Sequence, residues 1–388
     1  MKNKISKRLS SLTQSEIRIM SIECEKKGGI NLSQGICDLP LPPVLADEAK
    51  AAIYRGMNHY TRYDGIRELR SAVAHKLLEY NEIQANPDTD IIISSGSTGA
   101  FYSACLALLD PGDEVLLFEP FYGYHEYTLL ALDIVPVFAK LTPPLWSFEP
   151  DKIESLITSR TKGIMINTPA NPSGKVFSRE ELNQLADLCI RHNLLIFTDE
   201  IYEYIVYDGL PHISPGSLDS IKDRVITISG YSKTFSITGW RIGYSVCKEE
   251  LARSIGYASD LVYVCAPSPL QVGVSQAITM LPPEFYQSLS SKYQGKRNLI
   301  CSAMEDVSLT PFVPQGAYYV LADVSSIPGK TSKEKAIFLL DKTGLAVVPG
   351  DAFYHDNGGE NLVRLCFAKE DKVLEEVCER LQALKSKS

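Results

Sequence analysis

The sequence predicts an α/β protein in which helices cover a mainly parallel, seven-stranded β-sheet, accompanied by a second, smaller α+β domain. Short apolar runs rich in β-forming residues alternate with helical stretches in the middle of the chain, the usual pattern of a parallel sheet with helical connections. From about residue 283 onward the character changes, because longer charged helical stretches flank short strands such as AYYVLAD and LVRLCFA. These two observations predict two unequal domains.

Seven runs are the predicted strands of the large sheet. They are IIISS (91–95), EVLLF (114–118), IVPVF (134–138), GIMIN (163–167), LLIFT (194–198), VITIS (225–229) and RIGYSVC (241–247). Among the connecting helices, SREELNQLADLCIRHN has Ser178 at its start and Glu181 three residues later, which predicts a capping box. The expected parts of the chain are an arm with part of the small domain (1–45), a large domain (46–282) and the small domain (283–388).

Composition narrows the classes of partner. The chain has 388 residues and a formal net charge of -8, which disfavours nucleic acid and anionic membranes, because both require a clustered basic face. Nine cysteines occur singly, without the paired spacing of a zinc site or a disulfide framework, so we expect no metal and a reducing, cytoplasmic compartment. The polar N-terminus and the lack of any stretch of about 18 apolar residues leave secretion and membrane spanning unsupported. A small metabolite is the expected partner.

Polar and glycine-rich segments follow five of the predicted strands. They are SGSTGA, EPFYGY, TPANPSG, TDEIY and GYSK. Ligands of open parallel sheets bind beyond the carboxyl ends of the strands. We therefore expect these five segments to meet in one crevice.

Several residues in these segments have a structural as well as a functional interpretation. Ser97 and Thr98 open a helix whose N-terminal N–H groups favour a phosphate, although such turns are often only structural. Asp199 directly after an apolar strand needs a cationic or hydrogen-bonding partner, unless it simply caps a helix. Asn171, in PANPSGK, is equally compatible with a tight loop.

The segment SGYSKTFSITGWRIGY is more specific. It places Lys233 just past a strand end, and we expect Tyr231, Phe235 and Trp240 to surround it. Partial desolvation lowers the pKa of a lysine and makes the neutral amine available for a Schiff base. Lys233 is therefore the candidate nucleophile.

These motifs resemble those of class I aminotransferases, the fold-type-I family of enzymes that use pyridoxal phosphate. The resemblance covers nearly the whole chain, because seven motifs occur in the same order. They are the arm SKRLSSLTQSEIRIM, the turn LSQGICDLPLPP, HYTRYDGIRELR, NPSG, DEIY, SKT with GWRIGY, and LVRLCFA.

The resemblance implies a role for each matched position. Lys233 would form the Schiff base with pyridoxal phosphate, Asp199 would pair with the pyridine nitrogen, and Arg364 would grip the substrate α-carboxylate. The other implied cofactor contacts are Asn171 and Tyr202 at the phenolic oxygen, Tyr122 on the ring face, and Ser97, Thr98, Ser232, Arg241 and a neighbouring subunit's Tyr60 at the phosphate. Gly35 would lie against the substrate, and Asn171 would also contact it. Many members have a serine where this chain has Gly230, which costs one phosphate hydroxyl.

The expected activity is transfer of an amino group from an L-amino acid to a 2-oxo acid with ping-pong kinetics, in a homodimer. Lyases on the same scaffold are an alternative, whereas a regulator with a basic DNA-binding module is disfavoured because only about 30 residues precede the LSQG turn. Segments 96–131 contain no Lys or Arg, which favours neutral, aromatic or sulfur-containing donors over aspartate, although the resemblance also implies that a cation such as Arg62 can come from the partner subunit or a mobile arm. The aromatic side chains available there and near the C-terminal loop are Phe101, Tyr102, Phe121, Tyr122, Tyr124, Tyr127, Phe353 and Tyr354.

Overall fold

A computed structural model describes residues 6–9 and 12–385. The expected N-terminal arm therefore falls partly outside the described residues, at positions 1–5 and 10–11. Among the described residues, no helix combines the length and apolar character needed to cross a membrane.

The large sheet has seven strands in the order β2-β8-β7-β6-β5-β3-β4. Strand β8 runs antiparallel to both of its neighbours, and the other pairs are parallel, so the prediction of a mainly parallel sheet is confirmed. The strands are β2 (Ile91–Ser95), β3 (Glu114–Glu119), β4 (Val135–Lys140), β5 (Thr161–Asn167), β6 (Leu195–Asp199), β7 (Val225–Gly230) and β8 (Ile242–Val246).

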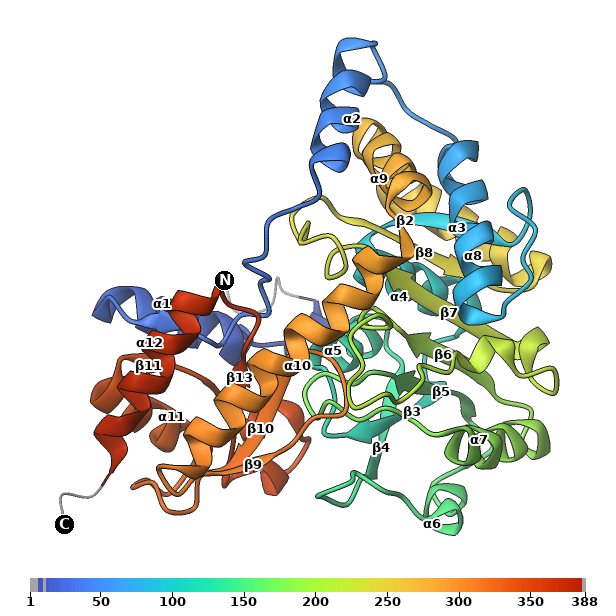
Figure 1. Cartoon of the computed structure of the whole chain (residues 1–388). Helices are drawn as coiled ribbons and strands as arrows, with labels where there is room; N and C mark the ends of the chain where they lie inside the picture. The colour runs from blue at the N-terminus through green and yellow to red at the C-terminus, as the bar shows by residue number, and fades with distance from the viewer. Residues whose placement is uncertain (1–5, 10–11, 386–388) are drawn as a thin grey trace.

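Helices cover both faces of this sheet because alternate strand residues point to opposite sides. Ile92 packs in one core with helices α4, α5 and α8, whereas Ile91 and Ile93 pack in another with α3 and α9. The bounds of these helices are α3 (Arg67–Asn81), α4 (Gly96–Leu108), α5 (Gly123–Ala131), α8 (Glu249–Tyr263) and α9 (Ser268–Met280). Figure 1 shows the layers.

Helix α7 (Arg179–Arg191) covers the second face beside α6 (Pro150–Glu154). Ser178 accepts a hydrogen bond from the backbone N–H of Glu181, and the Glu181 side chain accepts one in return from the backbone N–H of Ser178. The predicted capping box is therefore confirmed. Helix α2 (Pro43–Tyr54) packs along α9.

A separate, four-stranded antiparallel sheet of order β12-β13-β10-β9 lies in the C-terminal part of the chain. Residues from α1 share one hydrophobic core with this sheet and with α10, α11 and α12, which Figure 1 shows grouped beside the large sheet. The elements are α1 (Glu16–Lys27), α10 (Pro283–Glu305), β9 (Thr310–Phe312), β10 (Tyr319–Asp323), α11 (Ser332–Thr343), β12 (Val348–Pro349), β13 (Leu362–Cys366) and α12 (Asp371–Leu381).

A short pair of parallel strands connects the N-terminal segment to the C-terminal part of the chain. In this pair β1 (Ile30–Asn31) lies beside β11 (Leu345–Ala346). The expected domain boundaries near residues 45 and 282 stay a prediction. Single turns of 3₁₀-helix occur at Lys7–Leu9, Pro215–Ser217, Lys222–Arg224, Gly350–Phe353, Asn357–Gly359 and Gln382–Leu384.

Candidate active site

A cavity of about 430 Å³ opens beyond the carboxyl ends of the parallel strands. All five polar segments that follow the strands contribute to its wall, as the sequence predicts. The lining residues are Ser15, Ile17, Arg18, Gln34, Gly35, Ser97, Thr98, Tyr122, Tyr124, Asn171, Asp199, Ile201, Tyr202, Ser232, Lys233, Thr238, Arg241, Tyr319 and Arg364.

One end of the cavity has the features of an anion site. Ser97 and Thr98 lie in the first turn of α4, whose backbone N–H groups and helix dipole favour a negative charge. Gly96 has φ of 72°, and a Cβ atom there would collide with the Arg241 guanidinium. A Cβ atom on Gly243 would come within 2.6 Å of the backbone nitrogen of Ser97. These glycines therefore let the turn and the arginine approach each other closely.

Lys233 extends into the cavity from the turn after β7. Its Nζ donates a hydrogen bond of 2.9 Å to the backbone oxygen of Gly35. The rings of Tyr202 and Tyr318 lie 6.0 and 5.8 Å from the amine. Burial lowers the pKa of Lys233 from 10.5 to about 8, which confirms the direction expected from the sequence.

The aromatic surroundings of this lysine differ from the sequence expectation. Tyr231 and Phe235 stack on each other at 5.2 Å, deep in the core shared with α3 and α9, and Trp240 packs at the edge of that core. The chain from Tyr231 to Ser236 is a turn after β7, and it directs Tyr231 and Phe235 into the core while Lys233 lines the cavity. Rings from distant segments desolvate the amine instead.

Asp199 ends β6 with a buried carboxylate. Its Oδ2 lies 3.0 Å from Nε2 of His125, a residue of α5 that sequence reasoning missed. The Phe101 and Tyr122 rings meet the imidazole edge-on at 5.2 and 5.4 Å. The histidine therefore has few orientations available and can hold the carboxylate in place.

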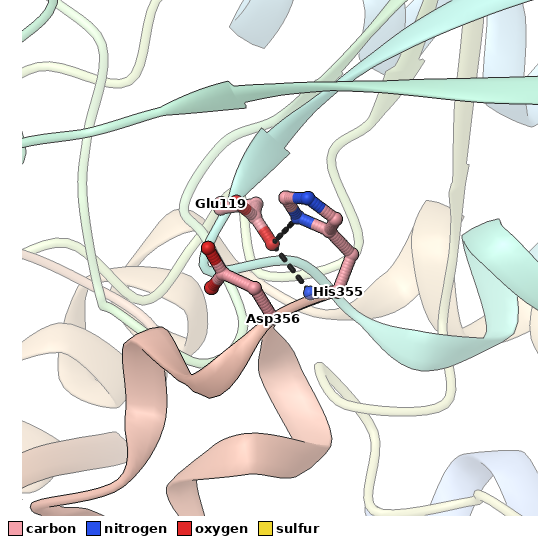
Figure 2. A group of neighbouring side chains, drawn as sticks. All are labelled: Glu119, His355 and Asp356. Carbon is pink, nitrogen blue, oxygen red and sulfur yellow. Dashed lines mark hydrogen bonds and ion pairs between the residues drawn. The ribbon is translucent and has the colours of Figure 1, made fainter.

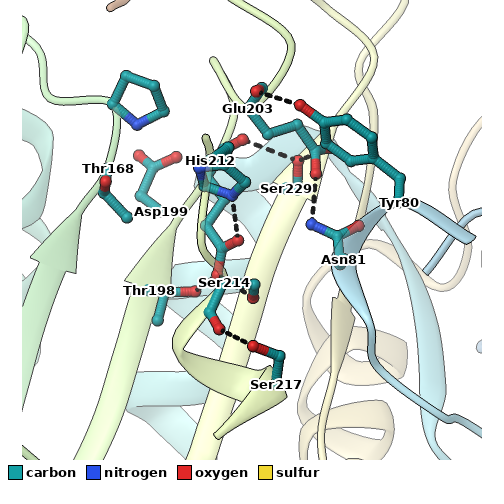
Figure 3. Close-up of polar contacts among 12 residues, drawn as sticks. Tyr80, Asn81, Thr168, Thr198, Asp199, Glu203, His212, Ser214, Ser217 and Ser229 are labelled. Carbon is teal, nitrogen blue, oxygen red and sulfur yellow. Dashed lines mark hydrogen bonds and ion pairs between the residues drawn. The ribbon is translucent and has the colours of Figure 1, made fainter. Parts of the chain in front are cut away.

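A buried polar network supports the chain just after Asp199 (Figure 3). The Glu203 carboxylate accepts hydrogen bonds from Lys76 at 2.5 Å, Asn81 at 2.9 Å and Ser229 at 2.9 Å. The Lys76 and Glu203 side chains are 6% and 2% exposed, so each charge depends on the other for compensation.

Glu200, next to Asp199, has hydrogen-bond partners of its own. Thr198 and Ser214 donate to its carboxylate at 2.6 and 2.9 Å, and His212 Nε2 lies 2.8 Å away. Thr198, Ser214 and His212 are labelled in Figure 3. The two glutamates thus fix the backbone that carries Asp199 and Tyr202.

Arg364, on β13, is a buried cation held only by neutral groups. Its Nη1 donates to Oδ1 of Asn171 at 2.9 Å, and its Nη2 donates to the backbone oxygen of Ser33. The guanidinium is 1% exposed and lies 4.3 Å from the centre of the Tyr319 ring. Its Nε lacks a hydrogen-bond partner, and no carboxylate pairs with it in the described part of the chain. A buried arginine of this kind is suited to an incoming carboxylate.

Two contacts shape the space beside this arginine. The hydroxyl groups of Tyr202 and Tyr319 are 2.9 Å apart. A Cβ atom on Gly35 would collide with the Tyr319 hydroxyl, so a side chain at position 35 would fill the gap between the tyrosine and the lysine.

The segment that carries Tyr122 is anchored to the C-terminal part of the chain (Figure 2). Glu119 Oε1 accepts a hydrogen bond from the backbone N–H of His355 at 2.6 Å and lies 2.9 Å from its Nδ1. The backbone N–H of Phe121 donates to the oxygen of Phe353 at 3.0 Å. These contacts hold the Tyr122 ring against the cavity, where burial raises the pKa of its hydroxyl.

The structure brings almost all the predicted site residues together. Gly35, Ser97, Thr98, Tyr122, Asn171, Asp199, Tyr202, Ser232, Lys233, Arg241 and Arg364 all line the cavity. Tyr60 does not line this chain's own cavity and is 83% exposed.

Most of the aromatic side chains that we expected near the donor do not line the cavity. Of that set, only Tyr122 and Tyr124 line the cavity, whereas Phe101, Phe121 and Phe353 are buried core residues. Sequence reasoning also missed Arg18, on α1, because the motifs at strand ends give no signal for a side chain that a distant helix brings to the cavity.

Comparisons with known proteins give consistent matches. The family model described as "Aminotransferase class I and II" matches residues 27–381. Kynurenine–oxoglutarate transaminase 3 of Rattus norvegicus is 36% identical over 376 residues, covering 89% of this chain and 83% of the relative. An aspartate aminotransferase of Pyrococcus abyssi is 32% identical, covering 97% of both chains. The structure of YbdL from Escherichia coli, whose description reports a methionine aminotransferase function, has a TM-score of 0.93 at 28% identity, covering 97% of this chain and 99% of the other.

Proposed function

This chain belongs to the class I and II aminotransferase family, and we propose that it holds pyridoxal phosphate on Lys233 to transfer amino groups from L-amino acids to 2-oxo acids. The observation that carries the proposal is one cavity that combines a lysine with a pKa near 8, a buried carboxylate and a buried arginine without an anionic partner. Each feature matches one requirement of amino-group transfer.

The residues present fit the cofactor. Arg241 and the first turn of α4, with Ser97, Thr98 and Ser232, would hold the phosphate, because they offer one cation, backbone N–H groups and hydroxyl groups in one place. Asn171 and Tyr202 would bind the phenolic oxygen, and the Tyr122 ring would stack on the cofactor ring. When bound, pyridoxal phosphate supplies an aldehyde for the amino group and a cationic ring that delocalises the electron pair left at Cα.

Each residue of the chain then has a distinct part in the reaction. Arg364 binds and orients the substrate α-carboxylate with its planar donors. With the cofactor bound, the neutral Lys233 amine would be the base that takes the proton from the substrate Cα. The Asp199 carboxylate, held by His125, would pair with the cofactor's ring nitrogen and favour its protonated form. The substrate thus loses its amino group, and a second 2-oxo acid takes it up in a ping-pong cycle.

The proposed donor is a neutral, aromatic or sulfur-containing amino acid. Support comes from Tyr122, Tyr124 and Ile17 on the cavity wall and from relatives named for kynurenine and methionine. An aspartate aminotransferase is an alternative, favoured by the relative from Pyrococcus abyssi. A lyase on the same scaffold is a second alternative, because orientation about Cα determines which bond breaks.

We also propose a homodimer located in the cytoplasm. The exposed Tyr60 supports the dimer, since in a composite site this residue would reach the partner subunit's cofactor phosphate. All nine cysteines are free thiols, which is in keeping with a reducing compartment. Small amino acids and 2-oxo acids are the proposed partners.

A donor screen tests this function. The purified enzyme, reconstituted with pyridoxal phosphate, is mixed with single amino acids and either 2-oxoglutarate or pyruvate, and the new 2-oxo acid is quantified. We expect phenylalanine, methionine or glutamine to give the highest kcat/KM. If aspartate exceeds all three by more than about tenfold, or roughly 1.4 kcal/mol in the transition state, the aspartate alternative is correct. If borohydride fixes the cofactor to a lysine other than Lys233, the assignment of the site is wrong.

A further inference from the structure

A second cavity, of about 640 Å³, shares no lining residue with the cavity that contains Lys233. It lies between the C-terminal part of α3, the loop 204–212 and the junction of α9 with α10. Sites for small molecules typically have volumes of about 300 to 1,000 Å³. The second cavity is therefore large enough for a small organic ligand.

Three tyrosine rings in contact with one another line the second cavity. The centre of the Tyr204 ring lies 4.2 Å from that of Tyr80 and 4.6 Å from that of Tyr286. Leu210 and Ile278 add aliphatic surface to the lining. Because aromatic rings interact favourably by offset stacking and edge-to-face contact, this surface favours a planar aromatic ligand.

The buried charge in the lining already has its partners. The Lys76 ammonium donates to Glu203 at 2.5 Å and to Asn81 at 2.8 Å. Its third N–H group donates to the Tyr244 hydroxyl at 3.0 Å, so no donor of this lysine remains for a ligand. Glu79, the one carboxylate among the lining residues, is exposed to solvent. An ionic ligand would bury its charge without a partner, which is unfavourable, so the lining favours a neutral ligand.

Three neutral groups of the lining have unused hydrogen-bonding capacity. Among the described residues, the hydroxyl groups of Tyr204 and Tyr286 form no hydrogen bond. The His212 side chain is 1% exposed, and its Nδ1 also lacks a partner in the described part of the chain. The Glu200 carboxylate accepts from Nε2 of this ring, so in the neutral imidazole Nδ1 is an acceptor. A ligand with an O–H or N–H donor would match these groups.

We propose that the second cavity is a ligand-binding site separate from the active site, and that it binds a neutral, planar aromatic molecule with a hydrogen-bond donor. The volume, the tyrosine rings, the compensated lysine and the unpartnered polar groups each support one part of this description. The proposal is independent of the proposed function, because it requires neither the cofactor nor a substrate.

The first experiment measures the binding of indole, which is neutral, planar and aromatic and has one N–H donor. Indole is titrated calorimetrically into the holoenzyme after borohydride reduction, so that the cofactor stays in the first cavity. We expect one site with a Kd below about 1 mM, as favourable contacts give for a ligand of this size.

Two close analogues test the chemical class of the ligand. 1-Methylindole lacks the donor and should bind about 3- to 10-fold more weakly, which is the contribution of one neutral hydrogen bond. Indole-3-carboxylate has a charge and should bind at least about tenfold more weakly. Equal binding of either analogue overturns the proposed ligand class, and no saturable binding of indole overturns the site. If the cofactor fails to attach to Lys233, the proposed function is wrong, but indole binding can still be measured.

The second experiment locates the bound indole with two substitutions in the lining. Leu210 is 41% exposed, so Leu210→Glu should leave the fold intact by circular dichroism while it adds a charge to the apolar surface. We expect it to weaken indole binding by at least about fivefold. Tyr286→Leu removes one ring and should weaken binding by about 2- to 10-fold. Wild-type affinity in Leu210→Glu, or in a folded Tyr286→Leu, would place indole elsewhere and overturn the proposal.

The matched control makes the same substitution outside the second cavity. Leu299 is on α10, is 43% exposed and does not line the cavity. Leu299→Glu should change the Kd of indole by less than about twofold, because surface charges at a distance are screened by solvent and salt. If Leu299→Glu weakens indole binding as much as Leu210→Glu does, the effect reflects the added negative charge in general, and the proposal is overturned.

Discussion

The pKa of Lys233 leads to a prediction about how the cofactor attaches. Burial lowers this pKa from 10.5 to about 8, and only the neutral amine attacks an aldehyde. At pH 7 the neutral fraction is then about 9%, against about 0.03% for a solvated lysine. Because lowering the pKa makes deprotonation easier, attachment should accelerate up to about pH 8 and then level off. Between pH 8 and pH 10 the rate should rise only about 2-fold, whereas a pKa of 10.5 requires about a 75-fold rise.

The assay mixes the apoprotein with pyridoxal phosphate at a series of pH values, traps the product with borohydride at set times and quantifies the labelled peptide. Nα-acetyl-lysine under the same conditions is the reference for an unperturbed amine reacting with the same aldehyde, and its rate should rise by about 75-fold between pH 8 and pH 10. Lys233→Ala should give no label at this peptide. A ratio between pH 10 and pH 8 near 75, in a protein still folded by circular dichroism, would refute the claim that burial activates this lysine.

Three further predictions concern the site and its support. Asp199→Ala should lower kcat by about 10² to 10³ with little change in KM, because the carboxylate acts mainly as charge develops in the transition state; near-normal steady-state turnover would contradict this. Lys76→Met should destabilise the protein by about 3 to 5 kcal/mol in denaturant unfolding, since it leaves Glu203 buried without a cation. The double variant Lys76→Met/Glu203→Leu should recover much of this loss, and a double variant less stable than Lys76→Met would exclude the explanation. Co-expression of Lys233→Ala with Tyr60→Ala should restore about one quarter of the wild-type activity, since half of the dimers contain one intact site of two. No activity above that of either variant alone would argue against composite sites.

Sequence patterns predicted the sheet well because most of its strands are buried on both faces. Such strands are continuous apolar runs, and the run at 114–118 became β3 (Glu114–Glu119). The direction of β8 could not be predicted in this way, because an apolar run has the same composition in either direction. Its antiparallel pairing with β2 and β7 depends on the path of the chain between them.

The site was predictable where its residues follow strand ends. Asp199 is the last residue of β6, and Lys233 lies in the turn that follows β7. The topology of the sheet therefore brings the two residues together. His125 and Arg18 reach the cavity through the packing of α5 and α1, which no local pattern records. For the same reason the rings around the Lys233 amine were wrongly expected to be its sequence neighbours.

The residues proposed to bind the cofactor come earlier in the chain than Arg364, so they are synthesised before it. The proposed cofactor contacts of one subunit lie between Ser97 and Arg241. Arg364 is on β13, which pairs with β10 and β12 and therefore can be placed only after nearly the whole chain has emerged. Because a chain folds progressively from its N-terminus as it is made, a nascent protein could complete its phosphate cradle well before it could grip a substrate.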